Sequence, residues 1–230
     1  MPQRSKDGEN ELPSDVAQAV EEKTLGSLVD TFPLQRRGLF TFKDTRHLVH
    51  RFEQGFVDDP AAGAAPLVAL RYDQISWVRQ AFVKHYVNHY YNRTTYSFGI
   101  RSTGGQVIQW KGSYFDSFQG SRFKSDGRLP EFGTELAKIV SQAQLPAHLK
   151  ALADGKALTF GNVVISQQGV RGPDGVVPWS QLEPLDVDRG VAMVRRTGHR
   201  KPMASTYLAS IPNLPLFSTL YENLRRPRPT

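Results

Sequence analysis

The chain of 230 residues contains no cysteine. Disulfide bonds, thiolate metal sites and a cysteine nucleophile are therefore excluded, and the composition fits a reducing compartment. Long hydrophobic runs are also missing. The longest apolar stretch, residues 60–70, contains Gly63 and is too short to cross a bilayer. The first residues lack the apolar core of a signal peptide. These absences favour a cytoplasmic protein.

The sequence is equally poor in patterns that mark catalytic and nucleotide sites. It has no Gly-x-Ser-x-Gly, no Gly-x-Gly-x-x-Gly and no phosphate loop. His85 and His89 would share one face of a helix, but their neighbours favour a strand, along which four residues span about 13 Å. Zinc needs every ligand atom about 2.1 Å from the ion, so these two histidines cannot both coordinate one zinc ion. We expect no enzyme, no metal site and no cofactor.

Charge is present but unevenly distributed along the chain. The formal net charge is +7, divided into −4 for residues 1–30, +6 for residues 31–146 and +5 for residues 147–230. An acidic leader, whose residues 1–12 are polar enough to be disordered, therefore precedes a basic body. Basic bodies attract acidic proteins, lipid headgroups or nucleic acid. Solubility alone is the alternative explanation of such a charge.

One pattern occurs twice. Residues 72–78 read Tyr-Asp-Gln-Ile-Ser-Trp-Val, and residues 179–185 read Trp-Ser-Gln-Leu-Glu-Pro-Leu. A Gln-Gly step precedes each copy, at residues 54–55 and 168–169, and an apolar-striped helix follows each. This order predicts a duplicated β-rich module in which Tyr72 corresponds to Trp179. Ile75 should likewise correspond to Leu182. Such modules usually bind other molecules rather than catalyse reactions.

Local signals place the elements of this module. We expect a helix from Ser14 to about Leu25 with Gly26 as its stop, and a loop at residues 58–66. Residues 67–111 should form three or four strands with turns near 88–93 and 103–105. A helix should open at Thr134 and break at Pro146. Trp77 and Trp179 are expected in the core. Asn213 should cap a final helix, whose apolar stripe consists of Leu216, Phe217, Leu220 and Leu224.

This order of strands followed by a helix resembles the pleckstrin-homology (PH-like) superfold. More closely, the chain resembles an uncharacterised family of bacterial tandem PH-like proteins, over about residues 25–226. The motifs that carry the resemblance are Leu25-Gly26, Phe160-Gly161-Asn162, Trp179 with Leu182, and Ile211-Pro212-Asn213.

The resemblance implies a fold but no activity. It implies a mainly β (α+β) protein of two PH-like antiparallel units, each closed by a C-terminal amphipathic helix, after a short N-terminal helix. The expected division is a leader and helix at 1–30, a first unit with a helical linker at 31–155, and a second unit with a basic, proline-containing tail at 156–230.

Two surface clusters are candidate binding sites. The first gathers aromatic and basic side chains near a presumed hairpin tip: Lys84, Tyr86, Tyr90 and Tyr91. Exposed aromatic residues at a loop tip are costly without a use, which favours a partner-binding patch. The alternative is a tip folded against the aromatic-rich residues 112–130.

The second cluster is a basic hairpin with four cations around a Thr-Gly turn: Arg195, Arg196, Arg200 and Lys201. Against an acidic membrane, four cations supply about 4 kcal/mol. This corresponds to a dissociation constant near 1 mM, so a second contact would be needed. The first hairpins of the two units contain only two basic residues, Lys43 and Arg46. So few basic residues in these hairpins count against specific phosphoinositide binding. A solvated hairpin is the alternative.

These observations predict a non-enzymatic binding or scaffolding module that recognises a protein partner or an acidic surface. The alternative is peripheral binding to anionic lipid through the basic hairpin, at the inner face of the membrane. Weak nucleic-acid binding is a further alternative, because aromatic residues interleaved with arginine can stack on bases. It is disfavoured by the lack of a base-reading helix. The sequence identifies neither the partner nor the oligomeric state.

Overall fold

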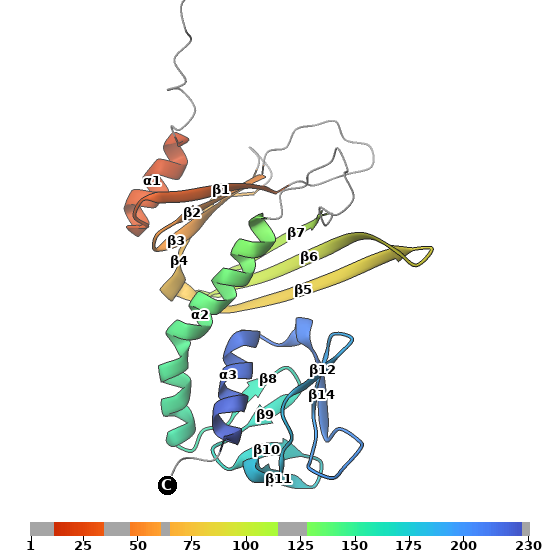
Figure 1. Ribbon diagram of the computed structural model, residues 1–230. Coiled ribbons are helices and arrows are strands. Elements are labelled where there is room, and N and C mark those ends of the chain that lie inside the picture. Colours follow the sequence, from red (N-terminus) through yellow and green to blue (C-terminus); the bar gives the residue numbers. More distant parts are fainter. Residues whose placement is uncertain (1–11, 35–46, 61–64, 115–127, 227–230) are drawn as a thin grey trace, which may run out of the picture. The chain divides into compact units, whose positions relative to one another are not determined.

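A computed structural model describes residues 12–34, 47–60, 65–114 and 128–226 (Figure 1). The first 11 residues of the acidic leader lie outside the described residues, as do Lys43 and Arg46. Contacts within the chain divide it into two compact units, Met1–Tyr72 and Asp73–Thr230. Within the described ranges, no helix is both long enough and apolar enough to cross a membrane.

The first unit consists of a helix and a four-stranded antiparallel meander. Its elements are α1 (Ser14–Lys23), β1 (Leu28–Leu34), β2 (His47–Phe52), β3 (Gly55–Asp59) and β4 (Val68–Arg71), with the strands in the order β1-β2-β3-β4. Val16 of α1 and the following Leu25 are fully buried in one cluster with Phe52 and Val57 of the sheet. The apolar side of the expected N-terminal helix therefore packs on strands.

Two local expectations in this unit need correction. The helix ends at Thr24, whose φ of 52° is left-handed, two residues before the expected stop at Gly26. Asp58 and Asp59 do not lie in a loop. They are the last residues of β3, because β3 keeps its pairing with β2 as far as the partners Leu48 and Asp59.

The second unit begins with a sheet of long strands. After the 3₁₀ turn η1 (Tyr72–Gln74) come β5 (Ile75–Val87), β6 (Tyr90–Ser102) and β7 (Val107–Tyr114), in the order β5-β6-β7. The turns at residues 88–89 and 103–106 fall where the sequence predicted turns. The helix α2 (Arg128–Ala153) packs on this sheet, and its Phe132 ring lies 5.8 Å from the ring of Trp110.

The helix α2 is continuous over 26 residues, so the break expected at Pro146 does not occur. Leu136 and Val140, before the proline, are buried. Leu145 and Leu152, after it, pack into the core of the C-terminal elements. An interior proline costs a helix about 3 kcal/mol. Burial on both sides of Pro146 outweighs this cost, and tertiary packing here overrides the local signal.

The remaining elements form two small sheets and a helix. They are β8 (Leu158–Phe160), β9 (Val163–Ile165), β10 (Gly169–Gly172), β11 (Gly175–Pro178), η2 (Trp179–Gln181), β12 (Asp186–Asp188), β13 (Val191–Val194), β14 (Ala204–Tyr207), η3 (Leu208–Ser210) and α3 (Leu214–Arg225). The sheets have the orders β11-β10-β9-β8 and β12-β13-β14. The boundary expected between residues 155 and 156 falls between α2 and β8, inside the second compact unit.

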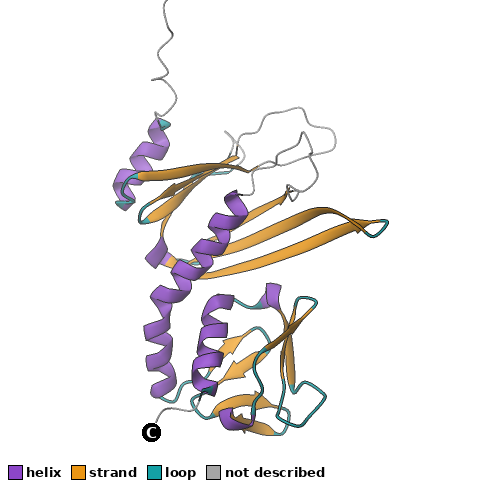
Figure 2. Cartoon of the chain, in the orientation of Figure 1, coloured by secondary structure: helices purple, strands orange, loops and turns teal. Residues whose placement is uncertain are grey.

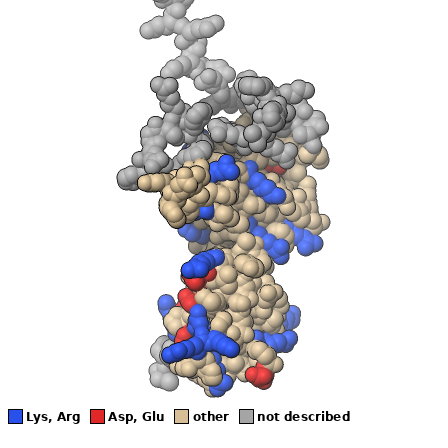
Figure 3. Space-filling view, turned by 90° about the vertical axis from the view of Figure 1, so that its right-hand side faces the viewer, with Lys and Arg blue, Asp and Glu red and all other residues tan. Residues whose placement is uncertain are grey.

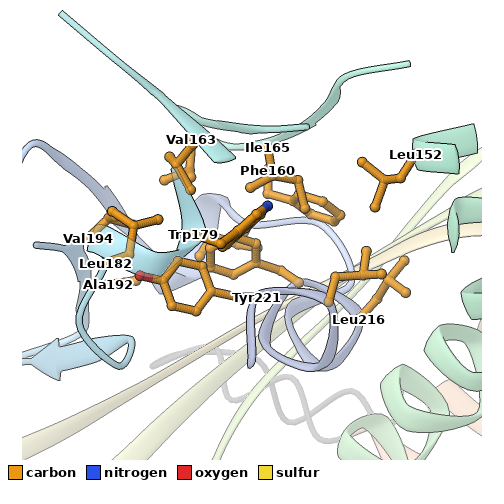
Figure 4. Packing of buried hydrophobic residues seen from close by; sticks show 14 residues of the cluster. Leu152, Phe160, Val163, Ile165, Trp179, Leu182, Ala192, Val194, Leu216 and Tyr221 are labelled. Carbon is orange, nitrogen blue, oxygen red and sulfur yellow. The ribbon is translucent and has the colours of Figure 1, made fainter. Parts of the chain in front are cut away.

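The core of these elements forms around α3 (Figure 4). Leu216, Phe217 and Leu220 are fully buried, which confirms most of the stripe predicted from the sequence, whereas Leu224 is only half-buried. Tyr221, which the stripe did not include, is also fully buried. Its ring stands edge-on to that of Trp179, with 5.5 Å between centroids.

Of the two tryptophans predicted to lie in the core, only one is buried. Trp179 is buried as expected. Trp77 is only half-buried, because it lies on the opposite face of β5 from the buried Val78, and the guanidinium of Arg79 sits 4.7 Å from its ring centre. The tryptophan that fills the core of this sheet is Trp110, which is fully buried.

Asn213 is the N-cap residue of α3, as predicted, but its side-chain contacts differ from those of a helix cap. Its side chain makes no capping hydrogen bond to α3. Instead, its Oδ1 accepts from the backbone N–H of Val78 at 2.8 Å, and its Nδ2 donates to the Ser76 carbonyl and to Oε1 of Gln144. Its own N–H donates to the carbonyl of Val78. One buried asparagine thus joins β5, α2 and the start of α3.

The same order of elements occurs twice along the chain (Figure 2). A four-stranded meander, a 3₁₀ turn, a three-stranded meander and a helix run from β1 to α2 and again from β8 to α3, where an additional 3₁₀ turn, η3, precedes the helix. All described sheets are antiparallel, three α-helices accompany them, and no sheet of the described residues closes into a barrel. The predicted mainly β, α+β class is confirmed.

Matching hydrogen bonds accompany the repeated sequence pattern. The hydroxyl of Tyr72 donates to the carbonyl of Phe52, and Nε1 of Trp179 donates to the carbonyl of Ser166. Each acceptor lies three residues before the glycine of a Gln-Gly step. Each aromatic residue therefore ties its 3₁₀ turn to a chain segment at the same position in the pattern.

Candidate functional site

The longest hairpin of the described chain is formed by β5 and β6, each 13 residues long. Asn88 and His89 connect them with φ values of 49° and 68°, the left-handed pair that a two-residue type I′ turn requires. β7 pairs with β6 only between Thr94 and Arg101. Residues 85–93 therefore extend past the described end of β7, while residues 82–84 lie opposite the last β6 residues that pair with it (Figure 1). The end of the hairpin considered below is residues 82–91. We call these residues the hairpin tip.

The hairpin tip is both apolar and exposed. Of the twelve exposed large hydrophobic side chains among the described residues, five belong to it: Phe82, Val83, Tyr86, Val87 and Tyr90. Tyr90 is 74% exposed and Tyr86 is 60% exposed. A turn that only connects two strands does not need such a concentration of apolar surface, which is typical of interaction sites.

The four residues predicted for this site all lie on the hairpin, but in different settings. Tyr86 and Tyr91 are cross-strand partners whose rings stand edge-on, 6.1 Å apart. The Tyr91 hydroxyl is fixed at 2.8 Å from Oγ1 of Thr94, and Tyr91 is half-buried. Lys84 and Tyr90 are exposed. Tyr91 thus supports the tip, while the other three are available to a partner.

The sheet that carries the tip has charge of one sign only. From Ile75 to Tyr114 it contains five lysine and arginine residues and no aspartate or glutamate. They are Arg79, Lys84, Arg93, Arg101 and Lys111, and all five are exposed. Figure 3 shows one face of the molecule, on which lysine and arginine side chains are more abundant than acidic ones. Acidic groups of a partner would meet no repulsion from this sheet's own side chains.

The basic turn, residues 195–201, follows β13 and does not act as one cluster. The guanidinium of Arg195 forms a salt bridge with Asp186 at 3.1 Å and donates to the carbonyl of Arg200. Arg195 therefore holds the turn closed. No ion pair involves Arg196, Arg200 or Lys201 within the part of the chain that the structure describes. Three of the four predicted cations therefore have no ion-pair partner among the described residues.

A surface cavity of about 350 Å³ lies beside the basic turn. Arg196, His199 and Lys201 line it together with Gln181 and with the turn that joins β10 to β11. That turn contributes one acidic residue, Asp174. Guanidinium, ammonium and amide groups that face one cavity are suited to an anion such as a phosphate. The sequence predicted Arg196 and Lys201 as candidates but gave no sign that Gln181 would line the same cavity.

A hydroxyl, an imidazole and a carboxylate also line up in the first unit. Oγ1 of Thr31 lies 3.0 Å from Nδ1 of His50, whose Nε2 is 3.8 Å from Asp59. Burial lowers the pKa of His50 despite the nearby carboxylate, and burial raises the pKa of Asp59. The imidazole is almost completely buried and the carboxylate is beyond hydrogen-bond distance. These contacts join β1, β2 and β3.

In the described part of the chain, no three His, Asp or Glu side chains converge into a group that could hold a metal ion. His85 and His89 lie on the strand and turn of the hairpin, as the sequence predicted. Nε2 of His85 bonds to Oγ1 of Thr95 at 2.9 Å. Of the aromatic residues that could have packed against the tip, Tyr114 lies at the end of β7 with its ring 6.4 Å from that of Tyr96. The others, Phe115, Phe118 and Phe123, lie outside the described residues.

Sequence reasoning missed the aliphatic and phenylalanine part of the tip: Phe82, Val83 and Val87. Because side chains alternate between the two faces of a strand, one of two neighbouring apolar residues is normally buried. The sequence therefore did not indicate that Phe82 and Val83 are both exposed. The sequence offers no local signal for their exposure, because β6 pairs with this part of β5 as it does with the rest of the strand.

Comparison with curated proteins and comparison with solved structures gave no match. A family model matches residues 34–230, which include the hairpin tip and the basic turn. The chain therefore belongs to the DUF6585 family, a family of unknown function.

Proposed function

We propose that this protein is a non-enzymatic binding module that recognises a protein partner through the hairpin tip. The observation that carries the proposal is the concentration of five exposed large hydrophobic side chains within residues 82–90. Aromatic anchors with exposed rings are the residues that most often dominate protein interfaces. Lysine and arginine around them supply the polar rim that such interfaces have.

The scaffold in this proposal is a duplicated PH-like unit. The twofold order of strands and helices supports it, as do the matching hydrogen bonds of Tyr72 and Trp179. A bacterial cytoplasmic setting belongs to the same proposal and rests on the lack of cysteine and on the resemblance to bacterial tandem PH-like proteins. In such a scaffold, rigid sheets hold the hairpin and leave its end free for contact.

The test is affinity capture from cells of the native host with variants of the tip. Tyr86→Ser with Tyr90→Ser should reduce recovery of a partner by about tenfold or more, because two exposed aromatic anchors are lost. Tyr207→Ser is the matched control, since Tyr207 is 71% exposed but lies on β14. The captured partner must then bind the purified protein directly. Equal recovery with the tip variant and the control would refute the proposal.

A second candidate is binding of an anionic lipid headgroup in the cavity beside the basic turn. The convergence of Arg196, His199 and Lys201 on one cavity favours it. With Arg195 committed to Asp186, the three remaining cations of the turn supply about 3 kcal/mol against an acidic membrane. This is weaker than a 1 mM dissociation constant, so the membrane would need a second contact.

Sedimentation with vesicles of phosphatidylserine and phosphatidylcholine tests this candidate. Arg196→Glu with Lys201→Glu should abolish any binding, whereas Arg171→Glu, on β10 and outside the cavity lining, should retain most of it. Deletion of the acidic residues 1–12 should strengthen binding by removing negative charge. No sedimentation at low salt, with or without the leader, would eliminate lipid binding.

A further inference from the structure

The outer edge of β5 continues beyond the point where Asn213 covers it. β5 is an edge strand of its sheet, with β6 on only one side. At Val78, Asn213 occupies the free side and pairs with both the N–H and the carbonyl. Past Val78, no backbone hydrogen bond to the outer side of β5 occurs among the described residues. The covered position shows that this edge accepts the hydrogen bonds of a neighbouring chain segment.

The direction of the unpaired groups follows from Val78. Backbone groups alternate between the two sides of a strand, so residues two and four positions further along point the same way. The pairing of β5 with β6 has no irregularity between Val78 and His85. Gln80, Phe82 and Lys84 therefore direct their N–H and carbonyl groups away from β6. Together they form a regular row of outward-facing backbone groups. The short helix η3 lies beside part of β5, so the row is open to another strand towards the hairpin tip.

Side chains along this edge favour a partner of defined chemistry. Phe82 is 42% exposed and Val83 is 53% exposed, on opposite faces of the strand. Lys84 lies on the same face as Phe82, and Arg79 on the same face as Val83. An added strand would therefore meet one apolar and one cationic side chain on each face. No acidic residue of the sheet competes for these cations.

We propose that the edge of β5 from Gln80 to Tyr86 binds an extended acidic peptide segment of a partner protein by β-strand addition. The inference rests on the proposed function and specifies how the hairpin recognises its partner. Backbone hydrogen bonds to the edge supply affinity without regard to sequence. Alternating acidic and β-branched residues in the peptide supply specificity, since carboxylates pair with Lys84 and Arg79 while apolar side chains pack on Phe82 and Val83.

The probe is a capped, fluorescently labelled peptide of alternating Glu and Val, long enough to span the edge. Fluorescence anisotropy should show binding that weakens as salt rises, because the pairs are exposed. Amide hydrogen exchange should slow at Gln80, Phe82 and Lys84 when the peptide is added. The same peptide with N-methylated valines, which lack one row of donors, should bind about tenfold more weakly.

The decisive variant is Phe82→Pro. The N–H of Phe82 points away from β6. Proline at this position therefore removes one donor from the edge of β5 and obstructs the edge, without breaking a hydrogen bond to β6. Peptide binding should fall by about tenfold or more. Val107→Pro is the matched control: Val107 is 52% exposed on the other edge strand, β7, and the same alternation points its N–H away from β6. This variant should bind like the parent protein.

Charge and side-chain variants separate the contributions. Phe82→Ala keeps the edge donors and should lose less affinity than Phe82→Pro. Lys84→Glu should weaken binding of the Glu peptide and strengthen binding of a Lys peptide. Thermal melts of every variant show whether it is folded. If Phe82→Pro and Val107→Pro bind the peptide equally while both are folded, strand addition is wrong.

Three other outcomes would also overturn the inference. Equal affinity for the N-methylated peptide would mean that the edge donors are not used. Binding of single-stranded oligothymidylate in place of the peptide would identify the sheet as a nucleic-acid surface. Self-association of Lys84→Val without any peptide binding by the parent would identify Lys84 as a guard against edge pairing.

The failure of this inference and that of the proposed function give different results. If a partner binds through the tyrosines alone, Tyr86→Ser with Tyr90→Ser abolishes capture while Phe82→Pro leaves it unchanged. If the hairpin has no partner, none of these variants changes capture.

Discussion

The hairpin β5–β6 and the hairpin β12–β13 each follow a 3₁₀ turn, yet they present different surfaces. β5 and β6 have 13 residues each, whereas β12 and β13 have three and four. The long hairpin ends in exposed apolar side chains. The short one leads into the basic turn. One order of elements thus supports two kinds of surface, and the fold by itself predicts neither.

The turns that follow β6 and β13 sharpen this contrast. In each, a threonine N–H donates to the carbonyl of the glutamine that ends the 3₁₀ turn: Thr103 to Gln74, and Thr197 to Gln181. A glycine follows each threonine. Residues 102–106 carry no charge, while residues 195–201 carry four cations. The same backbone hydrogen bonds therefore accompany either a neutral or a basic turn.

The largest expected effect is a loss of stability when a buried leucine is removed from α2 or α3, the helices that end the two repeated orders of elements. Leu220→Ala in α3 should lower the free energy of unfolding by about 2–5 kcal/mol, because Leu220 is fully buried. Leu136→Ala in α2, equally buried, should cost a similar amount. Denaturant unfolding of both variants measures this. A near-neutral Leu220→Ala would show that α3 is peripheral to its core.

The glycines of the two Gln-Gly steps give a direct comparison of the repeated pattern. A side chain at Gly55 would collide with the carbonyl of Leu70, and one at Gly169 with the carbonyl of Val177. Alanine at either position should destabilise the fold by about 2–3 kcal/mol. Gly104→Ala, where an added carbon meets no close atom, should be nearly neutral. Unequal losses at Gly55 and Gly169, measured by thermal unfolding, would break the correspondence.

Alkaline pH should lower the stability of the protein through Tyr221 of α3. Burial raises the pKa of Tyr221 to about 12 from its ordinary value of 10, with a smaller contribution from the charge of Glu222. The unfolded chain loses this proton near pH 10, while the folded chain keeps it to about pH 12. Stability should therefore fall between pH 10 and 12, by up to about 3 kcal/mol.

Urea titrations at several alkaline pH values check this, with Tyr221→Phe as the control. The variant loses the hydrogen bond from the Tyr221 hydroxyl to the carbonyl of Glu183. It should be less stable at neutral pH but show a shallower decline above pH 10. An unchanged slope would mean that other groups cause the alkaline loss.

The smallest effect concerns the basic turn. Arg195→Ala should cost at most about 1 kcal/mol, because its salt bridge with Asp186 is partly exposed. Arg200→Ala should leave stability unchanged, since the Arg200 side chain is exposed and forms no ion pair with the described residues. Thermal melts at low and high salt compare the two. Equal melting temperatures would show that Arg195 does not hold the turn.

The fold was more accessible from the sequence than the sites. Helical stripes and turn residues act locally, which is why α3, the hairpin turn at Asn88 and the mainly β class could be predicted. Pro146 shows the opposite case, because burial by distant elements decided its conformation. The binding candidates lay on the correct hairpins, but Arg195 and Tyr91 turned out to be held by neighbours. Only three-dimensional pairing could reveal that.

The long sequence separation between Val78 and Asn213 has a consequence for synthesis of the chain. The asparagine that covers this edge of β5 is 135 residues away. A ribosome adds about 5–20 residues per second, so the edge emerges several seconds before its cover is made. During that interval the nascent sheet exposes a continuous unpaired edge, and chaperone contacts or pairing between neighbouring nascent chains would occur there first.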